Sequence, residues 1–358
     1  MREILLNPGP VNLSERVRQA LLRPDICHRE PEFAALQQSI RRQILRIHDL
    51  PEQEWAAILM TGSGTSAMEA MITSCIPARG KVLVIENGVY GERLSRIAAI
   101  HGIDHACLRH EWGAAINIDH LTQRLSEEPG FTHVAIVHHE TTSGRLNPLE
   151  AIAGVCAEFR VKLLVDGVSS FGAEELRFEK WGIHACAATA NKCLHGIPGT
   201  SFVIVRREAL YQAEAVQRTL YLDLNTYLRQ QDQNGTPFTQ SVQSFYALDE
   251  ALREHAEGGG WRARRTEYWR RMDSVRNGLA DLKIAALLRR EDCSCVLNAF
   301  RLPNNLTYTS LHDGLKQRRF IIYAGQGDFA KTLFRISVMG AITQSDVERF
   351  LDAMRGLL

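Results

Sequence analysis

Short apolar runs alternate with longer segments of helical spacing through the first 210 residues of the chain. The apolar runs are rich in β-branched residues and occupy positions 57–60, 81–85, 133–137, 162–165 and 201–205. A strand that is apolar throughout is covered on both faces, as in the parallel sheets of α/β proteins. The intervening segments predicted to be helical are 66–75, 91–101, 118–127 and 149–159. The pattern therefore predicts an α/β fold with a mostly parallel sheet.

The pattern changes in the last third of the chain. A long helical pattern runs from about residue 239 to residue 276 and is interrupted by three glycines at 258–260, where helix is costly. Beyond it, strand patterns at 295–300, 320–323 and 333–337 and a closing helix at 344–357 indicate a small α+β domain. The predicted division is an N-terminal segment over 1–15, a large domain over 16–257 and a small C-terminal domain over 258–358.

Composition excludes several classes of protein. The chain has 358 residues, 45% of them hydrophobic and 23% charged, which is typical of a soluble globular protein. Its 42 Lys and Arg against 41 Asp and Glu give no net attraction to nucleic acid or to an anionic membrane, so neither is an expected partner. Without a signal-peptide pattern or a long apolar run, we expect a cytoplasmic protein whose eight cysteines are reduced thiols.

The loop Thr61-Gly-Ser-Gly-Thr-Ser66 lies between a predicted strand and a predicted helix. Its backbone N–H groups face the positive end of the helix dipole, which favours an anion such as phosphate. The motif alone is weak, because it matches neither a P-loop nor a complete GxGxxG and a capped tight turn explains it as well.

Two further residues make the loop more specific. Asp166 ends an apolar strand, where the side chain faces the ligand crevice of a parallel sheet, although helix capping is an alternative. Lys192 stands among small residues in Ala190-Asn-Lys-Cys-Leu-His-Gly, an enclosed setting that suits a lysine forming a Schiff base. A phosphate loop, an acid and an enclosed lysine match the three parts of pyridoxal phosphate (PLP) that a protein must hold.

The chain resembles the class V aminotransferases of fold type I, which have a large domain with a mostly parallel sheet and a small C-terminal α+β domain. The resemblance covers nearly the whole chain in the expected order. The motifs that carry it are Asn7-Pro-Gly-Pro-Val, Thr61-Gly-Ser-Gly-Thr, His139-Glu-Thr-Thr-Ser-Gly-Arg-Leu-Asn-Pro, Val165-Asp-Gly-Val-Ser-Ser-Phe-Gly, Ala190-Asn-Lys-Cys-Leu-His-Gly-Ile-Pro-Gly and Phe334-Arg-Ile-Ser-Val-Met-Gly.

The resemblance implies a role for each matching position. Lys192 would form the Schiff base with the cofactor, Asp166 would pair with the pyridine nitrogen, and Tyr90 would stack on the ring. The other implied contacts to the cofactor phosphate and ring hydroxyl are Ser63, Gly64, Thr65, Asn191 and Thr142, with Thr239 reaching the phosphate of a neighbouring subunit. Arg335 would bind the substrate carboxylate. Gly9 and Arg29 are further expected substrate contacts.

The implied activity is a ping-pong transfer of an amino group from a small amine, with 2-aminoethylphosphonate as the best candidate, to a keto acid such as pyruvate. The implied assembly is a homodimer with shared active sites. Two departures from the phosphonate-specific members bear on the donor: Tyr323-Ala-Gly-Gln326 lacks an expected lysine, and Cys27-His-Arg-Glu30 adds an arginine and a histidine.

Three alternatives stay open. The altered segments allow a PLP-dependent lyase or decarboxylating enzyme of a biosynthetic pathway. The α/β pattern with its glycine loop is also compatible with a nucleotide-binding oxidoreductase, which leaves Lys192 unexplained, or with a PLP-binding protein without turnover.

Other clusters give weaker signals. Cys293 and Cys295 with His312 are a poor zinc candidate because a second ligand pair is missing, and no metal is expected. The arginines at 262–265 and 270–271 are interpreted as the solvated face of a helix.

Overall fold

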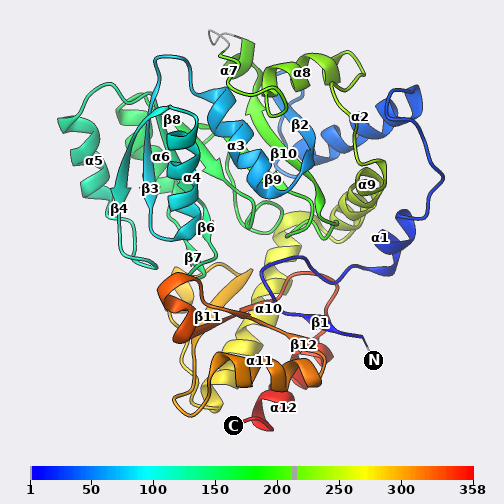
Figure 1. Cartoon of the computed structure of the whole chain (residues 1–358), viewed down its shortest axis with the longest axis vertical. Helices are drawn as coiled ribbons and strands as arrows, with labels where there is room; N and C mark the ends of the chain where they lie inside the picture. Colours follow the sequence, from blue (N-terminus) through cyan, green and yellow to red (C-terminus); the bar gives the residue numbers. More distant parts are fainter. Residues whose placement is uncertain (1, 212–215) are drawn as a thin grey trace.

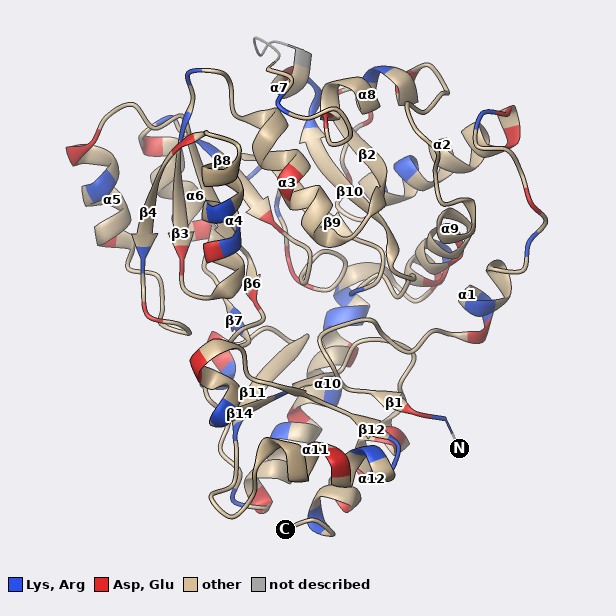
Figure 2. Cartoon of the chain, viewed as in Figure 1, with Lys and Arg blue, Asp and Glu red and all other residues tan. Residues whose placement is uncertain are grey.

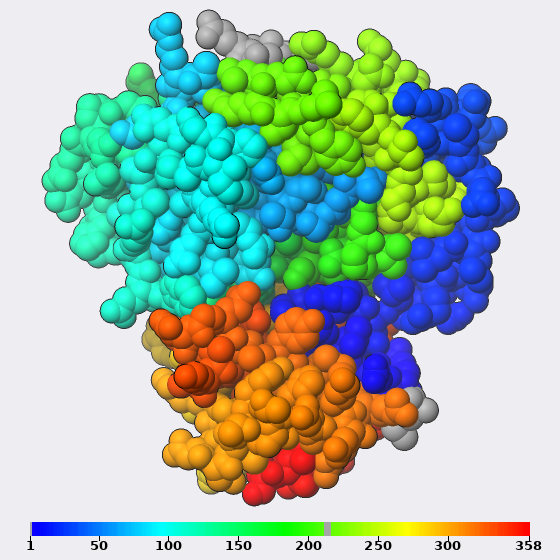
Figure 3. Space-filling view, viewed as in Figure 1, coloured from blue at the N-terminus to red at the C-terminus, as the bar shows by residue number. Residues whose placement is uncertain are grey.

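The computed structural model describes residues 2–211 and 216–358 of the chain. In the view of Figure 1 the chain forms an upper lobe around a large sheet and a lower lobe that contains both described ends of the chain. The lower lobe holds the first strand and the chain from about Gly260 onward. The dark-blue N-terminal residues lie directly against the orange C-terminal residues in Figure 3.

The upper lobe is built on a seven-stranded sheet of order β2-β10-β9-β8-β5-β3-β4. Its strands are β2 (Trp55–Gly62), β3 (Lys81–Glu86), β4 (Asp104–Arg109), β5 (His133–Val137), β8 (Lys162–Asp166), β9 (Ile183–Thr189) and β10 (Gly199–Arg206). β10 runs antiparallel to both β2 and β9, and the remaining pairs are parallel. The predicted α/β fold with a mostly parallel sheet is confirmed, and the reversed direction of β10 is a feature that the apolar pattern does not encode.

Helices cover both faces of this sheet, which explains why its strands are continuously apolar. One apolar cluster joins alternate residues of β2, such as Leu59, to α2 (Pro31–Arg46), α5 (Ile118–Glu127), α6 (Leu149–Glu158) and α9 (Val242–Glu257). The other joins the intervening residues, such as Ile58, to helices of the second face. These are α3 (Gly64–Cys75), α4 (Val89–Ile100) and α8 (Leu224–Asp232). The strands other than the edge strand β4 thus contribute to two cores in alternation.

The lower lobe has its own apolar core. A three-stranded antiparallel sheet of order β11-β14-β13 lies beside helices, and β1 pairs in parallel with β12. The bounds are β1 (Ile4–Leu5), β11 (Leu297–Arg301), β12 (Phe320–Ile321), β13 (Tyr323–Ala324), β14 (Leu333–Ser337), α10 (Gly260–Asp281), α11 (Tyr308–Gln317) and α12 (Gln344–Arg355). The short remaining elements are α1 (Glu15–Ala20), β6 (His139–Glu140), β7 (Arg145–Leu146), α7 (Arg207–Tyr211) and the 3₁₀ helices η1 (Arg290–Asp292) and η2 (Gly327–Lys331).

The break predicted at 258–260 is present, because α9 ends at Glu257 and α10 begins after Gly259 in the left-handed conformation, with φ 88°. The domain limits themselves stay a prediction. The single strand predicted over 320–323 is wrong: β12 pairs with β1 and β13 with β14, so the chain changes partner between them.

Charge is mixed over the molecule. In Figure 2 the basic and acidic segments alternate along the helices and loops of both lobes. Among the described residues, no helix is long and apolar enough to cross a membrane.

Candidate active site

The predicted site residues follow the carboxyl ends of neighbouring strands in the large sheet. Asp166 at the end of β8 is in register with Val137 at the end of β5 and with Ala187 near the end of β9. The segments after these strands therefore meet at one edge, where ligands of such sheets bind. The segment after β9 carries Lys192, and the segment after β2 carries Ser63.

Lys192 lies against the N-terminal segment. Its Nζ donates a hydrogen bond to the carbonyl oxygen of Pro8, 184 residues earlier in the chain. Gly9 has φ +116°, and a Cβ there would stand 3.0 Å from Lys192 Nζ, so only glycine leaves the amine this space. Burial lowers the pKa of Lys192 to about 8, which makes the neutral, nucleophilic amine accessible near physiological pH.

Asp166 is buried at the end of β8. Its Oδ1 accepts a hydrogen bond from Val168 N at 2.9 Å, and among the described residues the other oxygen accepts none. Burial raises the pKa of Asp166 to about 7, and the nearby Glu140 adds to the rise. A cation placed at the free oxygen would keep this carboxylate ionised.

The loop after β2 has the geometry expected of an anion site. Ser63 is the N-cap of α3, yet its side chain makes no capping hydrogen bond, which leaves N–H groups at the start of the helix open to a ligand. A Cβ at Gly64 would lie 2.7 Å from Val168 Cγ1. Gly64 thus lets the start of α3 approach the segment that follows Asp166.

Glu140 ties the segment after β5 to the start of α4. The carboxyl group is fully buried and accepts hydrogen bonds from Thr142 Oγ1 at 2.6 Å and from Gly91 N at 3.2 Å. Thr142 Oγ1 in turn accepts one from Val89 N at 3.1 Å, next to Tyr90. The sequence analysis missed Glu140 as a site residue, although it stands inside the motif that contains Thr142.

Arg335 brings the lower lobe to the site. It lies buried on β14, and its Nε donates to Ala324 O at 2.8 Å. Its Nη1 donates to Thr141 O at 3.0 Å and to Gln326 Oε1 at 3.3 Å. Arg335 makes no ion pair with the described residues, so its charge is available to a ligand. Gln326, whose role the sequence left open, therefore lines the same corner as Arg335 and Thr142.

Three predicted residues form no hydrogen bond with the Lys192 side chain in the described part of the chain. Asn191 accepts a hydrogen bond from Thr189 Oγ1 at 2.8 Å. Thr239 is exposed, and its neighbour Ser241 bonds to Thr61 next to the phosphate loop. Arg29 is exposed in the segment between α1 and α2, and no hydrogen bond or ion pair within the described chain joins it to the site.

The interpretation of the arginines on α10 as a solvated face is wrong in part. Arg264 donates to the carbonyl oxygen of Cys193, next to Lys192, and burial lowers its pKa. Arg271 donates to Val338 O and Gly340 O, both at 3.3 Å. Their alternation with exposed arginines hid these inward contacts in the sequence.

The weaker candidates stay apart from the site chemistry. In residues 2–211 and 216–358 no group of three or more His, Cys, Asp or Glu side chains is arranged to hold a metal ion. His312 pairs with Asp313 at 2.9 Å, while Cys293 and Cys295 are buried.

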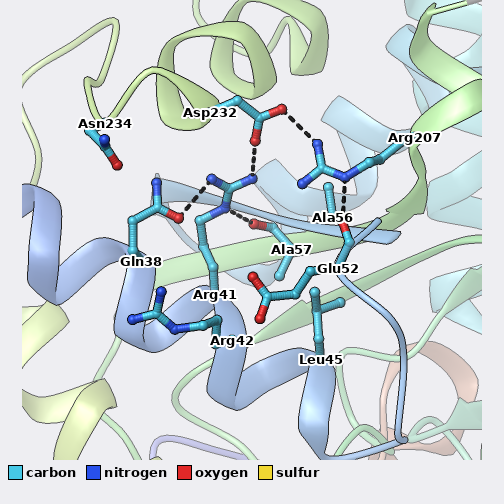
Figure 4. A pocket seen from close by; sticks show the side chains of 10 residues that line it. All are labelled: Gln38, Arg41, Arg42, Leu45, Glu52, Ala56, Ala57, Arg207, Asp232 and Asn234. Carbon is cyan, nitrogen blue, oxygen red and sulfur yellow. Dashed lines mark hydrogen bonds and ion pairs between the residues drawn. The ribbon is translucent and has the colours of Figure 1, made fainter. Parts of the chain in front are cut away.

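A separate pocket in Figure 4 lies at the other end of β2, beside Ala56 and Ala57. In this pocket the Asp232 carboxylate forms ion pairs with Arg41 at 2.7 Å and with Arg207 at 2.6 Å. The carboxylate thus joins α2, α7 and α8, and the cluster is explained as a structural ion-pair network.

The residues at the strand ends fit PLP. Three features correspond to its aldehyde, ring nitrogen and phosphate: the enclosed amine of Lys192, the Asp166 oxygen that has no partner within residues 2–211 and 216–358, and the uncapped helix start at Ser63.

Comparison with known proteins agrees with this geometry. The sequence profile described as aminotransferase class V matches residues 20–350. The chain belongs to the class V aminotransferases. The 2-aminoethylphosphonate–pyruvate transaminase of Phocaeicola vulgatus is 33% identical over 356 residues, 98% of each chain. The transaminase of the same name from Bacillus cereus is 32% identical over 98% of this chain and 96% of its own. The alanine–glyoxylate aminotransferase of a Nostoc species has a TM-score of 0.93 at 26% identity, covering 100% of this chain and 95% of its own.

This class V aminotransferase is a PLP-dependent transaminase of fold type I. The membership favours transamination over the lyase and over the nucleotide-binding oxidoreductase that the sequence had left open. Full coverage of the relatives also shows that the resemblance is not confined to the PLP motifs.

Proposed function

We propose that this aminotransferase transfers the amino group of 2-aminoethylphosphonate to pyruvate. Two relatives of about the same length carry that activity in their names. The observation that carries the proposal is the corner formed by Arg335, Thr141 and Gln326, where a buried guanidinium without an ion pair among the described residues faces the strand ends. A planar guanidinium binds a carboxylate through two parallel hydrogen bonds, as a keto acid requires.

Each step of the proposed reaction is assigned to a residue of this chain. PLP, when bound, supplies a ring that accepts electrons as a proton leaves the substrate carbon. Lys192 Nζ, with its lowered pKa, is the base that takes this proton and gives it back at the neighbouring position. Asp166, whose second carboxylate oxygen has no hydrogen-bond partner among the described residues, would hold the ring nitrogen and stay ionised beside it. Tyr90 would stack on the ring, and Arg335 would orient the keto acid.

The identity of the amino donor is tested by comparing two donors, each assayed separately with pyruvate. Purified enzyme with pyruvate is expected to form alanine from 2-aminoethylphosphonate and much less from 2-aminoethanol, an amine with the same two carbons but no anionic group. Equal rates would contradict the phosphonate assignment. Arg29→Ala is expected to raise KM for the phosphonate and leave that for 2-aminoethanol unchanged, because only the anion uses the charge.

Arg335→Lys tests the acceptor site. Lysine keeps the charge but loses the two-pronged geometry, so KM for pyruvate should rise about ten-fold or more while PLP binding persists. Arg301→Lys, at the exposed end of β11, is the matched control and should leave KM unchanged. Loss of PLP together with activity in Arg335→Lys would argue for a structural role instead.

The cofactor attachment is tested by borohydride reduction and peptide mapping, with the pyridoxyl group expected on Lys192. An adduct on another lysine would contradict the assignment. Lys192→Ala should give no pyridoxyl adduct after reduction and keep its fold, because the side chain supplies a covalent bond rather than core volume.

We also propose a homodimer. Thr239 is exposed and its neighbours are anchored to Thr61, so it is placed to reach a second chain from beside the phosphate loop. Thr239→Val should weaken PLP binding by about 1–3 kcal/mol if it leaves a phosphate oxygen unpaired. A PLP titration of the variant measures the effect, and full affinity in a monomeric enzyme would contradict the shared site.

A further inference from the structure

One arginine near the phosphate loop has no acidic partner. Arg93 lies on the first turns of α4, half-buried, and its Nη1 donates to Thr65 Oγ1 at 3.3 Å. Its Cζ stands 4.6 Å from the centre of the Tyr90 ring, so the aromatic side chain holds the guanidinium in place. No carboxylate within residues 2–211 and 216–358 forms an ion pair with Arg93.

The positive charge of the Arg93 guanidinium is available to an anionic ligand. At the end of the neighbouring strand pair Arg109 pairs with Glu86 at 3.2 Å, whereas the contacts of Arg93 among the described residues are a hydroxyl and a ring, and the charge of Asp166 also acts on it. Thr65 stands at the N-terminal end of α3, where the helix dipole adds positive potential. The guanidinium, the dipole and the uncapped N–H groups therefore act on the same small volume.

The hydrogen bond also decides the direction of the Thr65 hydroxyl. A guanidinium can only donate, so Thr65 Oγ1 is the acceptor and its own hydrogen is left to be donated elsewhere. A phosphate oxygen above the start of α3 is an acceptor in the right place. Charge-assisted hydrogen bonds to phosphate are about twice as strong as neutral ones.

We propose that Arg93 is a positioning residue of the cofactor phosphate site. It orients the Thr65 hydroxyl as a donor and supplies positive charge to the phosphate, and the Tyr90 ring holds the guanidinium in place. The inference rests on the proposed use of PLP. It concerns a residue that neither the phosphate-loop motif nor the strand-end residues identify, since Arg93 comes from α4.

The experiment compares two ligands that differ only in the phosphate. Apoenzyme is titrated with PLP and with pyridoxal for the wild type, Arg93→Met and Arg96→Met. Arg96 lies on the same helix, exposed and without an ion pair among the described residues, and is the matched control. Arg93→Met is expected to raise the Kd for PLP about ten-fold or more and that for pyridoxal less than about two-fold. Arg96→Met should change neither.

The other outcomes overturn the inference. Equal weakening of both ligands would assign Arg93 to the support of Tyr90 or of the fold, and unchanged PLP binding would remove it from the site. In a Thr65→Val background, the additional effect of Arg93→Met should shrink, and an undiminished effect would show that it does not act through Thr65.

Folding is controlled separately. Thermal unfolding of each apoenzyme identifies a variant that no longer folds, in which case Arg93→Lys serves: it keeps the charge and should hold PLP within about three-fold of the wild type. A loss with lysine as large as that with methionine would contradict a role for the charge. Failure of the wild type to bind PLP would instead refute the proposed function, a result visible before any variant is compared.

Discussion

At the scale of single residues, Lys192 has its chemistry set by the packing around it. Burial is the main cause of its lowered pKa of about 8, while the nearby Asp166 carboxylate acts in the opposite direction. At this pKa about one amine in a hundred is neutral at pH 6 and about nine in ten at pH 9. An ordinary lysine, with its pKa of 10.5, would be almost fully protonated at both.

This yields a prediction for pH dependence. The rate at which PLP attaches covalently to the apoenzyme should rise with pH up to about 8 and level off above, because only the neutral amine reacts. Rapid-mixing absorbance measures the rate. Asp166→Asn removes the negative charge that raises the pKa of Lys192, so the midpoint should move to lower pH. A rate independent of pH, or a midpoint shifted upward in the variant, would contradict this account.

At the scale of elements, close approach between α3 and the segment after β8 depends on Gly64. A methyl group there would meet Val168 Cγ1 at 2.7 Å and Cγ2 at 3.0 Å. Gly64→Ala should lower the free energy of unfolding by about 1–3 kcal/mol and weaken PLP binding, since the phosphate loop must shift. Urea denaturation of the apoenzyme and a PLP titration measure the two effects.

Gly154 on α6 provides the control. A Cβ there meets nothing within 4 Å, and the residue lies inside a helix. Gly154→Ala should therefore raise the free energy of unfolding by about 0.5–1 kcal/mol and leave PLP binding unchanged. Stabilisation by both substitutions would show that α3 tolerates the side chain.

A second comparison at this scale concerns the network in Figure 4. Arg41 and Arg207 share the carboxylate of Asp232, yet the Arg41 side chain is 6% exposed and the Arg207 side chain 23%. Arg41 also donates to Ala57 O at 3.0 Å, and burial lowers its pKa. Arg41→Met should cost about 3 kcal/mol of stability and Arg207→Met less than about 1 kcal/mol, as urea denaturation would measure. Equal losses would mean that burial does not distinguish the two pairs.

At the scale of the whole molecule, exposed apolar residues near the phosphate loop support the proposed dimer. Leu220 is 75% exposed and Tyr221 40%, and the Tyr221 ring lies 5.0 Å from that of Phe238. Tyr221 also donates its hydroxyl to Thr61 O at 3.0 Å, close to the site. An apolar surface beside a predicted shared site is a candidate for contact with a second copy.

Leu220→Asp should therefore raise the dimer dissociation constant about ten-fold or more and weaken PLP binding with it. Ile100→Asp is the control, because Ile100 is 69% exposed at the end of α4. Sedimentation at several concentrations measures the association. A dimer that resists Leu220→Asp and dissociates with Ile100→Asp would place the interface elsewhere.

The sequence by itself determined most strands of the two-sided sheet, and it predicted candidate residues for the chemistry at their ends. Continuous apolar runs identified β2, β3, β5, β8 and β10, because both faces of these strands are buried. The apolar runs did not predict β4 and β9. β4 is a polar edge strand, and β9, Ile183–Thr189, is rich in alanine, which has little β-propensity. Asp166 and Lys192 could be proposed as site residues because Asp166 ends an apolar strand and Lys192 precedes another, each within a motif.

Tertiary structure alone decided which distant residues meet. Pro8 and Gly9, near the N-terminus, enclose the Lys192 side chain. Arg335 donates a hydrogen bond to Thr141, 194 positions earlier in the sequence. The periodicity of apolar residues indicates which face of a helix or strand is buried. Which other segment packs on that face depends on the direction of the strands and on how the two lobes pack together. The reversal of β10, the burial of Glu140 and the contact of Arg93 with Thr65 are decided in the same way, by burial and hydrogen bonding summed over segments far apart in sequence.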